Sequence, residues 1–310
     1  MKCRLFLAIA TTVLLLASNV FSEEPLFLRI AETRNAPAET VKFFDSFFTA
    51  KSRHDVGATM AHFSPKVLTY TDATLGWPLN NYQAIQDMFQ TYMPDWGQGR
   101  SYPLRIVGGP ESTIVLFVDT PELFGGEIRL IGSVDFAAGK IVRWIDYWDS
   151  TGFANSVYEK VRTPTDKFPT DFREKLVVDK VPPAFSMLAT RVQSAFSAGD
   201  IDGLTSDLSY DVIYEDLALR TQILGREATI RYLKRAGFQL PFGVKSVLNH
   251  IVGGVSGGGF EWRNASGEVR GVTALELNES GKITRMYSAY DGRLIKSEER
   301  QRLILLSSDE

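Results

Sequence analysis

The sequence predicts an α+β protein that contains the same fold twice in tandem. Ile-Val-Gly-Gly occurs at 106–109 and again at 251–254, 145 positions later (251 − 106 = 145). Around each copy the same order of features recurs: amphipathic stretches come first, and at least three strand-like runs follow. A repeat of this kind indicates architecture more firmly than any single motif. We therefore expect two cones, each with N-terminal helices packed on a curved antiparallel sheet that encloses a pocket.

The helices are predicted by the spacing of apolar residues. Each copy opens with a stripe on one helix face, made by Val41, Phe44, Phe47 and Phe48 in the first copy and by Leu188, Val192, Ala195 and Phe196 in the second. Pro37 suits the entry to the first of these helices. Amphipathic stretches at 82–92 and 227–233 predict a further helix in each copy.

The strands are predicted by alternation and by turn residues. Four turn sequences each separate two β-branched or aromatic runs: Gly125-Gly126, Ala137 to Gly139, Asn264 to Gly267 and Asn278 to Gly281. The Gly-Lys pairs at 139–140 and 281–282 are 142 positions apart (281 − 139 = 142), so the second copy is 3 residues shorter in its middle hairpin.

The chain is long enough for two domains and a leader. Lys2 and Arg4 precede an apolar run at 5–17 that is too short to span a bilayer, as in a secretory signal. The predicted order is a signal peptide at 1–22, a first domain at 37–149, a linker at 150–181 with a helical segment near 155–161, a second domain at 182–291 and a charged C-terminal tail at 292–310. We expect a secreted or periplasmic protein.

Charge and cysteine content exclude several classes of site and partner. Without residues 1–22 the formal net charge is (34 − 2) − 37 = −5, and no basic stripe is present, so we expect no nucleic-acid partner and no membrane partner once the signal is removed. Cys3 is the only cysteine, so the exported chain has no disulfide and no thiolate nucleophile. We expect no cofactor and no metal.

Four segments resemble the nuclear-transport-factor-2-like superfamily, in its SnoaL-like and ketosteroid-isomerase-like branches. They are Asn81 to Ile85 and Gly225 to Thr229, similar to the family's helix start, and the C-terminal strands Gly139 to Trp144 and Gly281 to Met286. The resemblance covers both domains. It implies a cone with one open end, and dimers formed through the outer sheet face. A tandem copy would supply its own partner, so we expect the two domains to pack on each other through Ile145 and Tyr147 and through Tyr287 and Ala289.

Asp146 is the first catalytic candidate. A strand over 141–149 places Val142, Trp144, Asp146 and Trp148 on one face. A carboxyl group between two tryptophans in a pocket is desolvated, which raises its pKa toward neutral pH. Asp146 also matches the catalytic carboxylate of SnoaL-like cyclases, as the resemblance implies. The alternative is an aspartate that faces solvent at the rim.

Asp72 is the second catalytic candidate, because its spacing to the following helix resembles that of the isomerase base. In the second copy Asp216 has a similar spacing, and Ser288 stands where Asp146 does in the first. A neutral hydroxyl is no general base without an activating partner. The offset between Asp72 and Asp216 is ambiguous by one residue, and one residue changes the face of a strand. A strand-end turn is the other interpretation of both aspartates.

The remaining candidates shape the pocket. Tyr70, Trp144 and Trp148 are expected to contact an apolar ligand, and His62 is a weaker candidate beside the first strand. The acid that helps hold an oxyanion in the isomerase has no counterpart. We therefore carry two functions: an exported enzyme that transfers a proton in the isomerisation, cyclisation or dehydration of a small apolar cyclic substrate, or a non-catalytic binding module built as an intramolecular pseudo-dimer. Glycosylation sequons stand at Asn264 and Asn278.

Overall fold

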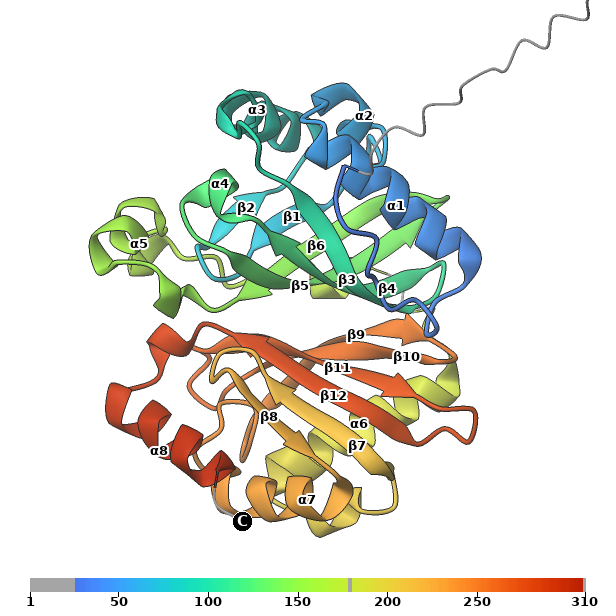
Figure 1. The fold of residues 1–310 in the computed structure, drawn as a ribbon, viewed down its shortest axis with the longest axis vertical. Helices are drawn as coiled ribbons and strands as arrows, with labels where there is room; N and C mark the ends of the chain where they lie inside the picture. The colour runs from blue at the N-terminus through green and yellow to red at the C-terminus, as the bar shows by residue number, and fades with distance from the viewer. Residues whose placement is uncertain (1–25, 178–179, 309–310) are drawn as a thin grey trace, which may run out of the picture.

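Two six-stranded sheets, each with its own helices, follow one another along the chain (Figure 1). The computed structural model describes residues 26–177 and 180–308, so the predicted signal peptide at 1–22 lies outside the described residues. The predicted α+β fold with two sheet domains is confirmed. The domain boundaries at 37–149 and 182–291 stay predictions.

The first domain begins with the helix that the phenylalanine spacing predicts. Its elements are α1 Ala38–Ser52, α2 Val56–Met60, β1 Thr69–Asp72, β2 Trp77–Leu79, α3 Tyr82–Tyr92, β3 Ser101–Gly108, β4 Ser112–Asp119, α4 Pro121–Phe124, β5 Ile128–Ala137 and β6 Lys140–Trp148. Helix α1 buries Phe44, Phe47 and Phe48. Helix α3 begins where Asn81 accepts a hydrogen bond from the backbone N–H of Ala84, as an N-cap residue does.

The second domain repeats most of this order. Its elements are α6 Pro183–Ala198, β7 Leu208–Asp216, β8 Thr221–Leu224, α7 Arg226–Ala236, β9 Val247–Gly254, β10 Gly257–Arg263, β11 Arg270–Leu277, β12 Ile283–Tyr290 and α8 Ser297–Ser307. A short 3₁₀ turn at Asp202–Leu204 follows α6, in the place that α2 takes after α1. The predicted tail forms α8, whose Leu303 is buried in the core of this domain.

Both sheets have the same strand order, β2-β1-β6-β5-β4-β3 and β8-β7-β12-β11-β10-β9. The predicted antiparallel pairing holds for every strand pair except one in each sheet, because β1 pairs parallel to β6 and β7 pairs parallel to β12. Turn residues reveal the pairing of strands joined by a hairpin, but β1 and β6 are joined only through the rest of the domain. The sheets are mixed and open rather than closed barrels.

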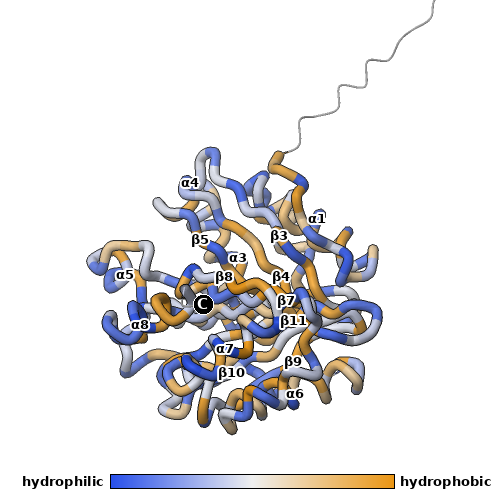
Figure 2. Tube along the Cα trace, turned by 60° about the horizontal axis from the view of Figure 1, so that its bottom comes forward, coloured by the Kyte–Doolittle hydropathy of each residue, from blue (hydrophilic) through white to orange (hydrophobic). Residues whose placement is uncertain are grey.

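Each sheet is covered on both faces. In Figure 1 the helices α1 to α3 lie on the outer side of one sheet, α6 and α7 lie on the outer side of the other, and the sheets face each other. All eight residues of β4 are buried, which matches its hydrophobic colour in Figure 2. Ile145, Tyr147, Tyr287 and Ala289 belong to one buried cluster that contains side chains of both domains. That this arrangement stands in for a homodimer remains a prediction.

Residues 150–181 are more than a spacer. Helix α5 Asn155–Val161 forms at the predicted helical segment, and its Tyr158 packs in the core of the first domain. Phe172 is fully buried among residues of both sheets. The ring of Phe168 lies against Gly76, at a position that a Cβ atom would occupy. Tyr158, Phe168 and Phe172 are therefore part of the fold.

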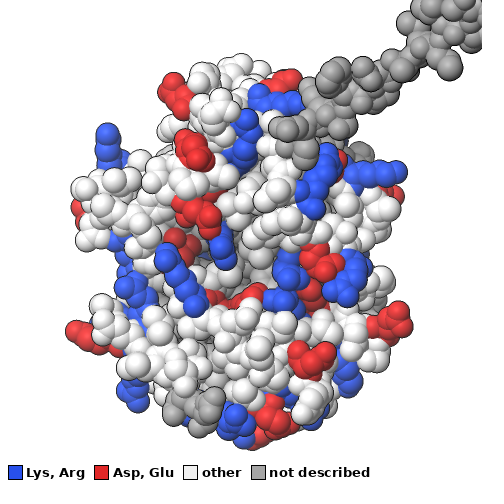
Figure 3. All heavy atoms as spheres, viewed as in Figure 1, with Lys and Arg blue, Asp and Glu red and all other residues white. Residues whose placement is uncertain are grey.

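The surface carries both signs of charge. Figure 3 shows lysine and arginine interspersed with aspartate and glutamate over the face in view. Among the described residues, no helix has both the length and the apolar character needed to cross a bilayer.

Candidate functional site

The first domain contains a cavity of about 220 Å³. It lies between the sheet and the short helices α3, α4 and α5, and its wall is largely apolar. Side chains that make this wall include Leu75, Trp77, Met88, Phe89, Trp96 and Leu130. The charged and hydroxyl-bearing residues that line the cavity are Lys51, Tyr70, Asp72, Tyr92, Asp119, Asp146 and Tyr158. Such an arrangement, apolar with a few polar groups, is typical of small-molecule sites.

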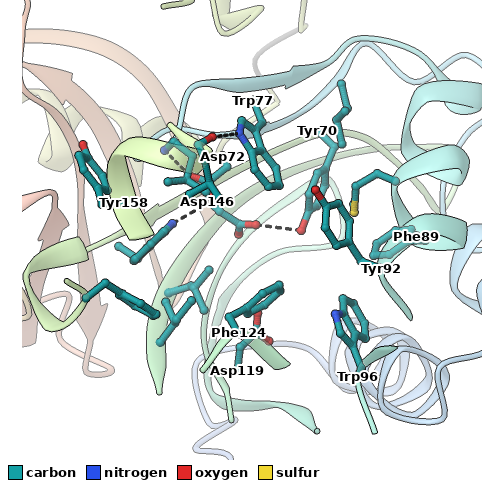
Figure 4. Close-up of a pocket in the computed structure, with 18 of the residues that line it drawn as sticks. Tyr70, Asp72, Trp77, Phe89, Tyr92, Trp96, Asp119, Phe124, Asp146 and Tyr158 are labelled. Atoms are coloured by element: carbon teal, nitrogen blue, oxygen red, sulfur yellow. Dashed lines mark hydrogen bonds between the residues drawn. The ribbon is translucent and has the colours of Figure 1, made fainter. Parts of the chain in front are cut away.

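Asp146 lies on the pocket side of β6 and is only 3% exposed. Its Oδ2 accepts a hydrogen bond of 2.9 Å from the hydroxyl of Tyr70, and its Oδ1 accepts one of 2.6 Å from Nε1 of Trp144. Figure 4 shows Asp146 and Tyr70 turned toward each other. Tyr70, Asp146 and Trp148 line the cavity, whereas Trp144 is packed in the apolar core and meets the site through its hydrogen bond to Asp146.

Burial dominates the titration of Asp146. Loss of solvent raises the pKa of its carboxyl group to about 7, although the hydrogen bond from Trp144 and the charge of Lys51 both favour the ionised form. The negative charge of Asp72 adds to the rise. A carboxyl group with a pKa near 7 exchanges a proton easily at neutral pH.

Asp72 sits beside Asp146, in register with it across the parallel pair β1 and β6. Its Oδ1 accepts hydrogen bonds from the backbone N–H groups of Thr74 and Leu75, so it caps the turn after β1. Its Oδ2 accepts a hydrogen bond of 2.9 Å from Nε1 of Trp148. Burial raises the pKa of Asp72 to about 6. Asp72 is therefore both a residue that caps the turn at the strand end and a carboxyl group that lines the pocket.

In the second domain, Asp216 and Ser288 stand at the positions of Asp72 and Asp146, so one of the two carboxyl groups is replaced by a hydroxyl. Asp216 is in register with Ser288, as Asp72 is with Asp146, which removes the ambiguity of one residue. Asp216 accepts hydrogen bonds from two backbone N–H groups and from the hydroxyl of Tyr290, and burial raises its pKa to about 7. The hydroxyl of Ser288 lies 2.8 Å from that of Thr273.

Bulky rings pack beside this second carboxylate. The ring centroid of Trp262 lies 5.5 Å from that of Phe242 and 5.8 Å from that of Tyr290. Tyr290 is fully buried, whereas Trp148, its counterpart 142 residues earlier, lines the cavity of the first domain.

The structure places His62 away from the pocket. Its Nδ1 lies 2.9 Å from the carbonyl oxygen of Ala58 and its Nε2 lies 3.0 Å from the hydroxyl of Ser46. Burial lowers its pKa.

The predicted alternation of faces along 141–149 fails at its first residue, because the side chain of Ile141 lies in the core of the first domain. A register shift in the pairing of β5 with β6 occurs at that point and reverses the face.

The pocket also contains a buried ion pair that was not predicted from the sequence. Lys51 in the last turn of α1 lies with its Nζ 3.2 Å from Oδ1 of Asp119 at the end of β4. One signal was available: Lys51 follows Phe44 and Phe48 at helical spacing, so it falls on the apolar stripe of the helix. Helix α5 also escaped as a pocket wall, to which it contributes Tyr158.

The arrangement suits proton transfer to a bound apolar molecule. It provides a proton acceptor with a pKa near neutrality, a cation and a largely apolar cavity. In the described part of the chain, no group of three or more histidine, cysteine, aspartate or glutamate side chains is arranged to hold a metal ion.

No protein-family model and no curated protein matches this sequence. Solved structures with similar folds include an uncharacterised protein with a cystatin-like fold from Silicibacter pomeroyi, at 20% identity and a TM-score of 0.32 over 41% of this chain and 83% of that one. A SnoaL-like protein of unknown function from Burkholderia thailandensis aligns at 14% identity and a TM-score of 0.32, over 37% of this chain and 99% of that one.

A steroid delta-isomerase from Pseudomonas aeruginosa aligns at 11% identity and a TM-score of 0.33, over 42% of this chain and 93% of that one. Other similar structures are described as NTF2-like proteins of unknown function, among them one from Burkholderia xenovorans. The chain is thus similar to NTF2-like, SnoaL-like, cystatin-like and steroid delta-isomerase folds, and its two similar sheet domains are consistent with two tandem copies.

Proposed function

We propose that the first domain binds a small, largely apolar ring compound and that Asp146 transfers a proton within it. The reaction class is an isomerisation, a cyclisation or a dehydration. The observation that carries this proposal is a carboxyl group with a pKa of about 7 on the wall of a largely apolar cavity. A general base or acid is most effective when its pKa lies near the working pH.

The cavity limits the size of the ligand. A closed apolar cavity of about 150 Å³ holds a benzene molecule. The cavity of about 220 Å³ therefore suits a compound of one or two rings. Aromatic walls favour flat rings, and Phe89, Tyr92 and Trp96 lie on the side of the pocket away from Asp72 in Figure 4.

Asp72 acts through its neighbours in this proposal. Its two oxygens are taken up by the turn after β1 and by Trp148, so it holds one wall of the pocket in place. Its charge also raises the pKa of Asp146. We assign Asp72 as a positioning residue and Asp146 as the group that touches the substrate.

A non-catalytic binding module is the second candidate. The observation that favours it is that both oxygens of Asp146 already accept hydrogen bonds within the protein, from Tyr70 and Trp144. A carboxylate has about four acceptor positions, so these two bonds leave it able to accept a substrate proton. They also suit a purely structural carboxylate.

Isotope exchange separates the two functions. A panel of one-ring and two-ring ketones is screened for thermal stabilisation of the full chain, and the best binder is incubated in D₂O while its C–H signals are followed by NMR. We expect the wild-type protein to accelerate exchange beside the carbonyl group. Asp146→Asn should reduce that rate about 100-fold or more with little change in affinity. The exposed Asp166→Asn serves as the matched control. Exchange that is no faster with the wild-type protein than without it would favour the binding module, and exchange that is equally fast with Asp146→Asn would eliminate Asp146 as the proton acceptor.

We also propose that the protein is exported and works outside the cytoplasm. The support is the charged start and the apolar run at 5–17, both outside the described residues. N-terminal sequencing of protein from its host tests this, and we expect the mature chain to begin near Glu23. An intact Met1 in a cytosolic fraction would refute it.

A further inference from the structure

The mouth of the cavity in the first domain is lined by exposed apolar side chains. Four residues that line the cavity also belong to the exposed large hydrophobic residues of the described chain, and they come from three elements: Tyr92 at the end of α3, Phe124 in α4, and Val157 and Val161 in α5. Between 38% and 49% of the surface of each is exposed. The cavity therefore opens to solvent between these three helices, and we call the four residues the rim.

Two tryptophans join the rim to the cavity wall. The ring of Tyr92 stacks on that of Trp77, with the centroids 6.0 Å apart, and the ring of Phe124 meets that of Trp96 edge to face, with the centroids 5.9 Å apart. Nε1 of Trp77 donates a hydrogen bond of 2.7 Å to the carbonyl oxygen of Val161. Both tryptophans line the cavity, so the rim continues its apolar wall outward. A connected apolar patch marks a binding surface, whereas scattered apolar side chains do not.

The ionisable groups lie at the inner end of the cavity. Lys51, Asp119 and Asp146 line it and are each at most 4% exposed. A bound molecule therefore places its polar group inward, and the part that meets the mouth lies against apolar side chains. Contact with the rim favours an apolar substituent at that end, because apolar surface gains free energy when it leaves water.

We propose that the ligand is a ring compound with an apolar chain opposite its polar group, and that this chain leaves the cavity over the rim. A cavity of about 150 Å³ holds benzene, so the cavity of about 220 Å³ takes the ring and only a few further carbon atoms. The rest of a longer chain lies between α3, α4 and α5, where Val157 and Val161 share one face of α5 at a spacing of four residues. This inference rests on the proposed function of the same pocket and names its substrate class.

A series of 4-alkylphenols tests the chain without any turnover. The hydroxyl group suits the polar interior, and the para position directs the alkyl chain toward the mouth. Binding of the ethyl, butyl, hexyl and octyl compounds to the full chain is measured by isothermal titration calorimetry. We expect the affinity to rise about twofold to fourfold for each added CH₂ group, because the rim removes much of the chain from water.

Two valines isolate the rim. Val157→Thr combined with Val161→Thr keeps the shape and the β-branching of both side chains and adds two hydroxyl groups. This variant should bind octylphenol about fivefold more weakly or less tightly still, and should bind ethylphenol within about twofold of the wild type. Val247→Thr combined with Val255→Thr changes two exposed valines of the second domain, is the matched control and should bind both compounds as the wild type does.

An affinity that stops rising beyond ethylphenol, or that rises equally in the rim variant, would overturn the proposal. If the rim variant instead breaks up a dimer in gel filtration, or releases the protein from phosphatidylcholine vesicles, a second copy or a lipid surface covers the rim and the proposal is also overturned. Asp146→Asn keeps the rim and should keep the effect of chain length, so this test can succeed even where the exchange test of Asp146 fails. A missing effect of chain length leaves the exchange test of Asp146 unaffected.

Discussion

Asp146 shows how burial outweighs hydrogen bonding at a single residue. Two donors, Tyr70 and Trp144, stabilise its ionised form, yet loss of solvent raises the pKa to about 7. The same balance holds for Asp72, with a pKa of about 6, and for Asp216, with a pKa of about 7. Three carboxyl groups are therefore protonated in the folded chain at pH values where an exposed aspartate, with a pKa of about 4, is ionised.

This difference makes the stability of the protein depend on pH. The folded state keeps its proton on Asp146 up to about pH 7, whereas the unfolded chain releases it near pH 4. The contribution of this group to the free energy of unfolding is therefore complete below about pH 4 and is lost as the pH rises to about 7. Replacement of Asp146 by asparagine removes this dependence.

We predict that Asp146→Asn gains stability relative to the wild type as the pH rises. Asparagine has one acceptor oxygen, so its amide faces one of the two donors and costs about 1 kcal/mol at any pH. At pH 5 the two proteins should be about equally stable, and at pH 8 the variant should be the more stable protein by a few kcal/mol. Chemical denaturation at both pH values measures this, with exposed Asp166→Asn as control. Equal differences at pH 5 and pH 8 would contradict it.

The pocket residues differ in how visible they are in the sequence. Asp146 was placed on the pocket face by a period of two and by its tryptophan neighbours, because a strand determines which side chains share a face. The period does not reveal Asp119, which ends β4 after five consecutive apolar residues at 114–118, so no alternation assigns it to one face. Its partner Lys51 stands on an apolar helical stripe, but only the tertiary structure brings the two charges together.

At the scale of elements, the repeated Ile-Val-Gly-Gly sequence lies where the backbones of the two domains come close together. A Cβ atom added to Gly254 would lie 2.6 Å from the backbone carbonyl of Gly108 and 2.8 Å from the backbone nitrogen of Gly109. The hydroxyl of Ser112 accepts a hydrogen bond of 2.8 Å from the N–H of Gly253. The ends of β3 and β9 thus meet backbone to backbone, and space accounts for glycine at 254.

We predict that Gly254→Ala destabilises the protein by about 1 to 3 kcal/mol, because rigid backbone atoms cannot move aside for the methyl group. Gly57→Ala in α2 is the matched control, since its Cβ would meet only a side-chain oxygen of Asp55, at 3.5 Å. That change should be neutral or stabilising by up to about 1 kcal/mol. Urea denaturation compares the two. The explanation by close approach fails if Gly254→Ala is as stable as Gly57→Ala.

Local elements were predictable, whereas their long-range pairing was not. Spacing of phenylalanines was enough for α1, and glycine-containing turns were enough for the hairpin between β5 and β6. The parallel pairing of β1 with β6 is not encoded in any turn between them. Helix α4 was missed because the three extra residues of the first copy appeared only as a longer hairpin, although Phe124 from this helix lines the pocket.

At the scale of the whole molecule, a buried charge network links the two sheets. Nη1 and Nη2 of Arg143 in β6 each lie 2.7 Å from one oxygen of Glu261 in β10, and both side chains are fully buried. Burial opposes ionisation of Glu261, but Arg143 lowers its pKa to about 2. Asp135 also contacts Arg143, and His250 contacts Asp135. A network of this kind supports the proposal that the tandem chain acts as its own dimer.

We predict strong coupling between Arg143 and Glu261 in a double-mutant cycle. Arg143→Met leaves Glu261 buried without its cation and should cost about 3 to 5 kcal/mol, whereas adding Glu261→Met should recover about 2 kcal/mol or more. The exposed pair Arg129 and Glu127 is the matched control, for which the coupling should stay below about 1 kcal/mol. If both pairs couple equally weakly, the network does not hold the domains together.

The second domain also holds a wall of the pocket in the first. Arg293, just after β12, donates hydrogen bonds of 2.7 Å to the carbonyl oxygens of Ser150 and Phe153, and its guanidinium lies 4.6 Å from the ring centroid of Tyr158. The hydroxyl of Tyr158 donates a hydrogen bond of 2.9 Å to Asp291. These contacts fix α5, which lines the cavity. The second domain, which has Ser288 in place of Asp146, thus supports the helix α5 that lines the pocket of the first domain.

We therefore predict that Arg293→Gln loosens α5 without unfolding either domain. Glutamine is shorter and uncharged, so it loses the bonds to the two carbonyl groups, the donor to the hydroxyl of Ser150 and the cation beside Tyr158. The backbone N–H groups of 153–161 should therefore exchange with D₂O about tenfold faster or more. Affinity for naphthalene, as a probe of the cavity, should fall by a similar factor because one wall no longer stays closed. Hydrogen exchange followed by mass spectrometry measures the first effect and fluorescence titration the second, with exposed Arg129→Gln as control. If exchange rises but naphthalene binds as before, α5 is held by the second domain but is not needed to close the pocket.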